Sequence, residues 1–185
     1  MGKKILNGLL KYVFTFIIVS AMIISVGCLK NNKVNAEEIE IKKGVVFTDE
    51  ETSAEYKITK VNVRKGEILG GNVTLVKITD KERKNVKIAD RVNINEIGFN
   101  VTVIGNNALK NCKKLQKLTI GKNIKKVGKN AFRGCKKLKR IVFSGDKVKK
   151  IGKNAFKGIS EEARFSASVR IYEKLLKLVS KSERR

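Results

Sequence analysis

The sequence of 185 residues has no histidine, proline or tryptophan and only three cysteines. Without histidine it lacks the commonest metal ligand and the commonest general base at neutral pH, which excludes Ser-His-Asp and Cys-His catalytic sets. Three cysteines are too few for a disulfide framework, and no G-x-x-x-x-G-K-[ST] phosphate loop is present. We therefore expect no enzyme, no metal and no cofactor, with an unrecognised pair of catalytic carboxylates as the alternative.

Acidic residues are also scarce, because 17 Asp and Glu face 42 Lys and Arg, which gives a net charge of +25. This balance allows an anionic partner, namely nucleic acid, anionic lipid or an acidic polymer, without choosing among them. Residues 37–185 alone keep 37 basic against 17 acidic residues, a net charge of +20. The charge is therefore a property of the main body of the chain.

Residues 1–36 have the pattern of a signal peptide. Three lysines at positions 3, 4 and 11 precede an uncharged apolar run over residues 12–29, and a short polar stretch then ends in Val34-Asn35-Ala36. Small residues at such positions fit the groove of a signal peptidase, so we predict cleavage between Ala36 and Glu37. The exported remainder would be secreted or held at the cell surface.

Two alternatives to a cleaved signal stay open. The apolar run is long enough to span a bilayer, so an uncleaved segment would make the chain a membrane protein. Gly27-Cys28 also resembles the end of a lipobox, although Ser25 stands where leucine is usual. The dibasic start and the Asn- and Lys-rich body are typical of a bacterial sequence.

Residues 104–165 contain an internal repeat. Gly105, Gly128 and Gly152 lie 23 and 24 residues apart. Four further positions keep the same spacing: Ala108, Ala131 and Ala155; Leu109, Phe132 and Phe156; Cys112 and Cys135; and Leu115 and Leu138. A period in the low twenties with leucine-rich cores is the signature of a solenoid.

Each repeat predicts a short strand followed by a turn. The cores Leu115-x-x-Leu118-x-Ile120 and Leu138-x-x-Ile141-x-Phe143 end in residues that alternate as one strand does. Asx residues after each core suit turns, where their side chains cap backbone amides. The segment Gly-x-Asn-Ala-Phe predicts a short helical turn with Ala and Phe packed inward.

The repeat resembles the BspA-type leucine-rich repeat of bacterial surface and secreted proteins, whose unit runs close to I-x-x-I-G-x-x-A-F-x-x-C-x-x-L-x-x-I-x-I-P. The resemblance covers roughly residues 85–165 and departs at the final proline, where Gly121 and Ser144 stand. It implies an α/β solenoid with two to three repeats of 23–24 residues. It also implies binding of a protein or other ligand at the cell surface or outside the cell.

We expect both ends of this array to be capped. The chain then has four segments: the signal peptide 1–36, the N-terminal cap 37–103, the repeats 104–165 and the C-terminal capping helix 166–185. In the region 37–103 apolar and polar residues alternate around turns with Gly, Asn and Asp, which predicts β-hairpins. Residues 166–185 have helical periodicity, which we expect to present Val169, Tyr172, Leu175, Leu176 and Val179 to the array, with lysines opposite. A basic amphipathic membrane helix is the alternative.

Cys112 and Cys135 occupy equivalent positions in adjacent repeats. Strands stacked about 5 Å apart would bring the two cysteines into the range of a disulfide. Their parallel side chains give poor geometry for the S–S torsion, so we predict buried free thiols. A disulfide or a metal pair is the alternative.

Lysine doublets recur at matching positions, and Lys113, Lys114, Lys136 and Lys137 are the candidate polyanion residues. Stacked lysines would form a ladder for teichoic acid, a glycan or nucleic acid. The competing interpretation is a solvated surface with a lysine bias. No aromatic residues interleave the doublets, so stacking of single-stranded nucleic acid is poorly supported.

The strand side of the solenoid is the other candidate surface. Alternation predicts that Lys117, Thr119, Arg140 and Val142 face outward, and these are the candidate binding face. We therefore expect an exported, monomeric leucine-rich-repeat interaction module for an unknown protein or cell-surface ligand. A cell-wall protein that binds an anionic polymer through the lysine doublets is the alternative.

Overall fold

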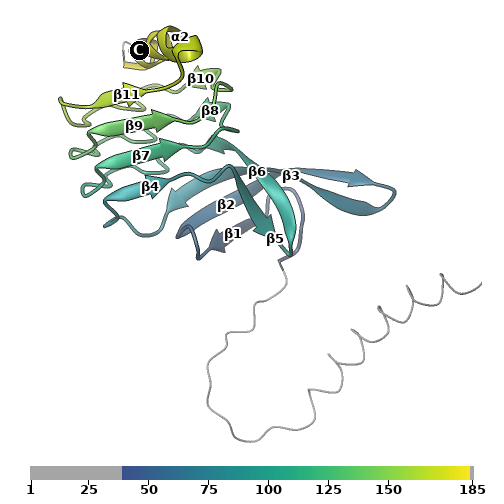
Figure 1. Ribbon diagram of the computed structural model, residues 1–185. Coiled ribbons are helices and arrows are strands. Elements are labelled where there is room, and N and C mark those ends of the chain that lie inside the picture. Colours follow the sequence, from purple (N-terminus) through teal and green to yellow (C-terminus); the bar gives the residue numbers. More distant parts are fainter. Residues whose placement is uncertain (1–38, 184–185) are drawn as a thin grey trace, which may run out of the picture. The chain divides into compact units, whose positions relative to one another are not determined.

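The computed structural model describes residues 39–183 (Figure 1). The predicted signal peptide, its cleavage site at Ala36 and Glu37, and the anchor and lipoprotein alternatives lie outside the described residues. One compact unit runs from Glu38 to Arg185, and its hydrophobic core extends from Phe47 to Leu175. This unit therefore has a core of its own. Among the described residues no helix combines the length and apolarity that crossing a membrane requires.

The unit contains two β-sheets and one helix. Sheet A comprises β1 (Val46–Asp49), β2 (Ala54–Arg64), β3 (Glu67–Ile78), β5 (Arg91–Ile94), β6 (Ile97–Ile104), β8 (Lys126–Val127) and β10 (Lys150–Ile151). Sheet B comprises β4 (Asn85–Lys87), β7 (Lys117–Ile120), β9 (Arg140–Phe143) and β11 (Arg164–Ser166). Helix α2 (Val169–Glu183) follows the last strand.

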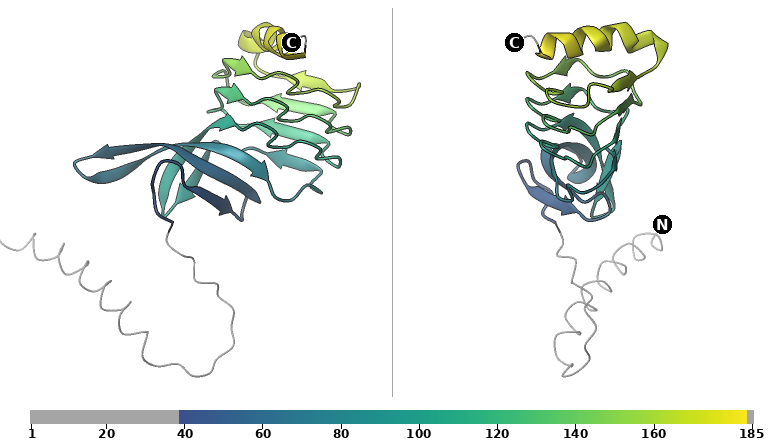
Figure 2. Two further views of the ribbon diagram at one scale, coloured as in Figure 1. Left: turned by 180° about the vertical axis from the view of Figure 1, so that it is seen from behind. Right: turned by 90° about the vertical axis from the view of Figure 1, so that its left-hand side faces the viewer.

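The chain passes from sheet A to sheet B four times and so forms four coils (Figures 1 and 2). Strands β4, β7, β9 and β11 pair in parallel within sheet B, while β3, β6, β8 and β10 do so within sheet A. The solenoid is confirmed, and it is longer than the expected two to three repeats. The additional coil, from β3 to β4, escaped the repeat alignment because its connection lacks the Gly-x-Asn-Ala motif.

Alternation along the strands places the core between the two sheets. Leu118 and Ile120 of β7 are buried, as are Ile141 and Phe143 of β9 in the next coil. Because a strand turns successive side chains to opposite faces, the residues between them point outward. Each buried side chain then packs on its equivalent one coil away, as Phe132 does on Phe156 with ring centroids 5.0 Å apart.

Glycine allows the coils to approach closely. A Cβ on Gly128 would lie 2.5 Å from the carbonyl carbon of Gly105, and one on Gly152 would lie 2.6 Å from the backbone nitrogen of Lys129. Both positions therefore meet backbone of the preceding coil, which cannot move aside as a flexible side chain can. The recurring glycine is thus explained by stacking rather than by an unusual backbone angle.

The Gly-x-Asn-Ala-Phe segment forms hydrogen-bonded turns and no helix, which corrects the predicted helical turn. Asn107, Asn130 and Asn154 adopt positive φ angles of 59°, 55° and 56°. Asparagine tolerates this left-handed conformation better than most residues, and a regular helix does not contain it. The inward packing of the Ala and Phe that follow is confirmed, because Ala131 and Phe132 are fully buried.

The N-terminal part consists of hairpins that continue into the first coil. Strands β1 and β2 form the expected hairpin, and β5 and β6 form another around Asn95 and Glu96. The region from β3 to β4, expected as a hairpin, instead crosses from sheet A to sheet B. It does so because both strands find parallel partners, β6 and β7, in the next coil.

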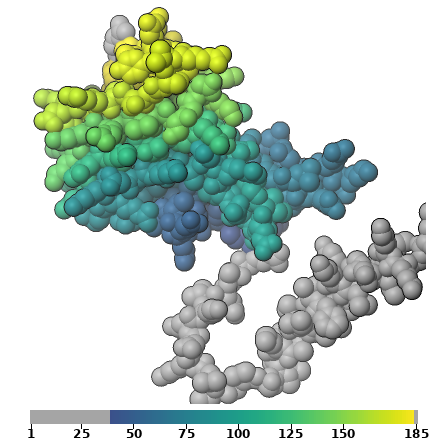
Figure 3. Space-filling model, in the orientation of Figure 1, coloured from purple at the N-terminus to yellow at the C-terminus, as the bar shows by residue number. Residues whose placement is uncertain are grey.

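The outer half of the β2–β3 hairpin, residues 59–70, forms an arm that projects beyond the coils (Figures 1 and 3). Lys65 and Gly66 form its tip with positive φ angles. Val63 and Leu69 are 60% and 57% exposed. Val61 and Ile68 at the base of the arm still pack against the core, whereas residues 62–67 are all exposed.

Helix α2 packs on β10 and covers the end of the coil stack (Figure 2). Its buried apolar residues are Ile171 and Leu175. Val169 is 95% exposed, and Tyr172 and Leu176 are 38% and 40% exposed. The capping helix is present, and Leu175 and Val179 of the expected face pack against the core. The helix is rotated relative to that expectation, so that Ile171 is buried while Val169, Tyr172 and Leu176 are exposed.

Candidate binding surfaces

The outward face of sheet B is the first candidate surface. Lys117 pairs in register with Arg140, and Arg140 pairs with Arg164 on the next strand. These three cations therefore form a column along the solenoid axis at the strand spacing of about 4.8 Å. All three side chains are exposed. We call this the sheet B column.

A second outward column lies beside the first. Thr119 pairs with Val142, and the row continues to Lys87 on one side and to Ser166 on the other. Thr119 and Val142 are half-buried. The structure thus places Lys117, Thr119, Arg140 and Val142 together on one face, as the alternation predicts; that they bind a partner stays a prediction.

The lysine doublets lie in the turns before sheet B, not on it. Lys113, Lys114, Lys136 and Lys137 are all exposed. The Nζ of Lys114 lies 3.9 Å from Oε2 of Glu82 in the coil below. The other three form no ion pair with any residue of 39–183. Glu82 therefore neutralises one end of this predicted ladder.

A second exposed acid, Glu162, pairs with Lys139, which lies outside the predicted ladder. The Nζ of Lys139 lies 2.7 Å from Oε2 of Glu162. The hydrogen bond and charge of Lys139 lower the pKa of the Glu162 carboxyl, with a smaller contribution from Arg164. Both side chains of the pair are exposed, so solvent screens it and its effect on stability is small. The sheet B column and the row beside it contain no acid.

Cys112 and Cys135 are buried and free, as predicted. The Cys135 thiol donates a hydrogen bond to the backbone oxygen of Leu109 at 3.0 Å. Its side-chain hydrogen bond with Cys112 and its burial raise the pKa of Cys135. Both effects favour the protonated thiol, so Cys135 is a poor nucleophile.

Asx side chains tie the coils together on the opposite edge. Asp90 Oδ1 accepts a hydrogen bond from the backbone nitrogen of Lys122, and Asn123 Nδ2 donates to the side chain of Asn100 at 3.2 Å. Lys147 then donates to Asn123 Oδ1 at 2.9 Å. These contacts use the polar atoms for structure, as expected of the turn after each strand.

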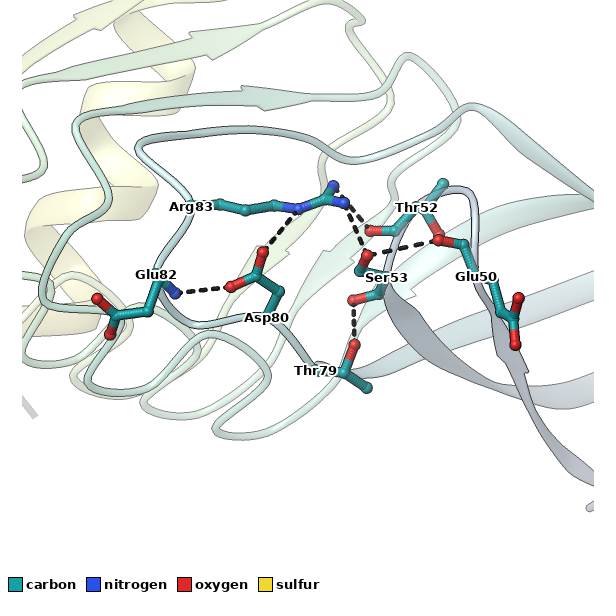
Figure 4. A network of polar contacts seen from close by, with 7 residues as sticks. All are labelled: Glu50, Thr52, Ser53, Thr79, Asp80, Glu82 and Arg83. Carbon is teal, nitrogen blue, oxygen red and sulfur yellow. Dashed lines mark hydrogen bonds and ion pairs between the residues drawn. The ribbon is translucent and has the colours of Figure 1, made fainter.

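A cluster around Arg83 joins the N-terminal hairpin to the first coil (Figure 4). Arg83 Nη2 donates to Ser53 Oγ at 2.7 Å, and Nη1 donates to the backbone oxygen of Thr52 at 3.3 Å. Asp80 accepts from Arg83 Nε at 3.3 Å. Both carboxylate oxygens of Asp80 accept a hydrogen bond, Oδ2 from Arg83 and Oδ1 from the backbone nitrogen of Glu82. The cluster is therefore a structural clamp.

Sequence reasoning missed several cations that belong to these surfaces. Arg164 completes the sheet B column and follows Gly152 by 12 residues, as Lys117 follows Gly105 and Arg140 follows Gly128. It was missed because Glu162 stands in its repeat where Leu115 and Leu138 stand in the others. Lys87 was missed because the first coil lacks the repeat motif. Among residues 39–183 no three His, Cys, Asp or Glu side chains gather as metal ligands do.

Three solved structures are similar to this chain, and the first of them shares its fold. A leucine-rich cell surface protein of Faecalibacterium prausnitzii A2-165 is 24% identical, with a TM-score of 0.51 over 69% of this chain and 32% of its own. A leucine-rich repeat protein of Bacteroides capillosus is 16% identical, with a TM-score of 0.44 over 66% of this chain and 98% of its own. The pneumococcal vaccine antigen PcpA is 17% identical, with a TM-score of 0.46 over 69% and 39%.

The chain thus spans about a third of the length of the Faecalibacterium protein, and at this identity the likeness concerns the fold alone. No curated protein matches the sequence significantly. The model of the BspA-type leucine-rich repeat region matches residues 76–176 in six copies, a count of sequence matches rather than of the four coils. More than half of the chain lies in this match, and the matched residues build the coils and their cap. The chain therefore belongs to the BspA-type leucine-rich repeat family.

Proposed function

We propose that this protein is an exported, non-catalytic interaction module that binds a protein or other cell-surface ligand through the outward face of sheet B. The observation that carries the proposal is the sheet B column, in which Lys117, Arg140 and Arg164 lie in register. In the neighbouring row Thr119, Val142 and Ser166 are uncharged and Lys87 adds a cation at one end, so an acidic partner can approach the column closely.

The paired rows fit a partner with an acidic patch beside an apolar one. Arginine forms two parallel hydrogen bonds with a carboxylate, and two arginines one strand apart would engage successive acidic groups. Strand pairing fixes the backbone of both arginines, so less order is lost on binding than in a flexible loop. The cell-surface description of the Faecalibacterium protein is consistent with such a role outside the cytoplasm.

Charge reversal at Arg140 tests this function. Capture of host and cell-wall fractions on the chain that begins at Glu37 should lose its specific partner with Arg140→Glu. Arg133→Glu is the matched control, because Arg133 is an exposed arginine of the same coil outside sheet B. Equal capture by the two variants would contradict the proposal. Circular dichroism must show that both variants keep the fold.

The second candidate function is binding of an anionic polymer through the lysine doublets. It is favoured by the equivalent positions of Lys113 and Lys136, and of Lys114 and Lys137, in adjacent repeats. Retention on heparin or teichoic acid should then fall steeply with added salt. It should also fall when these four lysines are replaced by glutamine. Retention that is unchanged by those replacements would exclude the doublets as the site.

Export has a separate test. Mass spectrometry of the protein from the culture medium or cell wall should find a chain that begins at Glu37. A full-length chain in the membrane fraction would instead support the anchor. Neither result bears on which face binds a partner.

A further inference from the structure

Four lysines line a cavity between the last coil and the capping helix. The cavity has a volume of about 410 Å³. Its lining residues are Lys149, Lys150, Ile151, Gly152, Lys153, Leu178, Lys181 and Ser182. It lies on the sheet A side and shares no residue with the sheet B column or with the four candidate lysines of the doublet ladder.

The charged residues of the lining are all lysines. None of the eight lining residues is acidic, and none of the four lysines forms an ion pair within the described residues 39–183. The acid nearest along the helix, Glu183, accepts hydrogen bonds from the backbone nitrogen of Phe156 and from Ser182 Oγ, at 3.1 and 3.2 Å. Its Oε1 is therefore engaged in closing the cap. The lining itself carries four positive charges and no negative one.

The walls of the cavity are fixed by backbone hydrogen bonds. Asn154 N donates to the backbone oxygen of Ser182 at 2.9 Å and so joins the last coil to the helix. Lys149 N donates to Lys125 O at 2.8 Å, and Lys150 pairs with Lys126 in β10 and β8. The lysine stems start from rigid positions, and Ile151 and Leu178 offer apolar surface for their methylene groups.

The chemistry of the lining selects the kind of anion. Lysine presents a compact ammonium that binds phosphate as a point charge, whereas the planar fork that recognises carboxylate belongs to arginine, and no arginine lines the cavity. No aromatic side chain is present on which a nucleobase could stack. The volume exceeds that of a single phosphate, and four cations match an anion with several charges.

We propose that this cavity is a binding site for the phosphate groups of a compact, multiply charged anion without a base. This goes beyond the proposed function, because it adds a second ligand at the end of the solenoid. A soluble oligophosphate and the headgroup of an anionic phospholipid share the required chemistry. The cavity ends in α2, so occupation of the site would also clamp the capping helix onto the last coil.

Calorimetric titration with sodium tripolyphosphate tests the site on the chain that begins at Glu37. Replacing Lys153 and Lys181 together by glutamine should weaken binding about tenfold or more, because two charge-assisted hydrogen bonds are lost. The matched control replaces Lys110 and Lys157, which are exposed and outside the cavity. It has the same net charge and should bind nearly as well as the parent. Titration with sodium sulfate at equal ionic strength measures unspecific attraction.

Three results would overturn the proposal: no binding of tripolyphosphate, equal weakening in the two double variants, or equal affinity for sulfate. Bound tripolyphosphate should also raise the melting temperature of the parent and of the control, and not that of the cavity variant. Vesicles of phosphatidylglycerol distinguish the source. Binding to vesicles that is lost in the cavity variant assigns the site to a lipid headgroup, whereas binding that persists in it assigns the site to a soluble phosphate.

Discussion

The tight stacking of the coils predicts that Gly128→Ala will destabilise the fold even though alanine is a better residue for most backbones. The added Cβ would lie 2.5 Å from the carbonyl carbon of Gly105 and 2.6 Å from the nitrogen of Asn106. Unstrained contacts require about 3.5 Å, so the two coils would have to separate locally by about 1 Å.

That separation would break hydrogen bonds between the coils. Gly128 N donates to Ile104 O at 2.8 Å, and Asn107 N donates to Lys129 O at 2.9 Å. An added 1 Å or so takes both beyond hydrogen-bonding distance. Two lost bonds and the remaining strain cost about 3 kcal/mol, and the stiffer unfolded chain offsets about 0.7 kcal/mol of this. The free energy of unfolding should therefore fall by about 2 kcal/mol.

Urea unfolding followed by far-ultraviolet circular dichroism measures this loss. The control is Lys129→Ala, because Lys129 is the exposed neighbour in the same turn, and a surface change of this kind should cost less than about 0.5 kcal/mol. If Gly128→Ala matched the control, the coils would not be in the close contact described here, and the explanation of the repeating glycine would be refuted.

Three further predictions concern other parts of the fold. Phe132→Ala should lower the free energy of unfolding by about 3–5 kcal/mol, because Phe132 is fully buried against Phe156; thermal unfolding tests this, and a loss below 1 kcal/mol or so would contradict it. The raised pKa of Cys135 means that its stabilising contribution is complete below the unfolded thiol pKa of about 8.5. This contribution is lost as the pH rises further. In urea titrations above that pH, the free energy of unfolding of Cys135→Ala should therefore decline less steeply with pH than that of the parent. Arg83→Ala should lower the free energy of unfolding by about 1 kcal/mol, because the contacts of Arg83 are partly exposed. It should also speed amide hydrogen exchange around Ser53 without affecting sheet B. An equal change of exchange throughout the protein would argue against a local clamp.

The regular part of the solenoid was predictable from the sequence because its spacing records the stacking directly. Residues 117–120 and 140–143 alternate in the sequence as they do in the strands, so the outward positions of Lys117 and Arg140 followed. The free, buried state of Cys112 and Cys135 also followed from their equivalent positions in adjacent coils.

What the sequence did not reveal depends on contacts between distant segments. The first coil has no Gly-x-Asn-Ala motif. It is defined by the parallel pairing of β4 with β7, in which Asn85 pairs with Lys117, 32 residues further along the chain. The rotation of α2 is set by how Ile171 and Leu175 fit the last coil, whereas periodicity indicates only that an apolar stripe exists. The cavity at Lys153 and Lys181 likewise arises where helix and coil meet.

The same backbone hydrogen bonds recur between successive coils, and this repetition affects how the protein can evolve. Each inner coil receives and offers the same pattern: Leu109 N donates to Ala131 O, and Phe132 N donates to Ala155 O. A coil of this kind can therefore be duplicated or deleted without a new interface, while the β1–β2 hairpin and α2 close the ends unchanged. Each event would lengthen or shorten the sheet B column by one strand spacing and one side chain. The reach of the binding face would then evolve in discrete steps rather than by gradual remodelling.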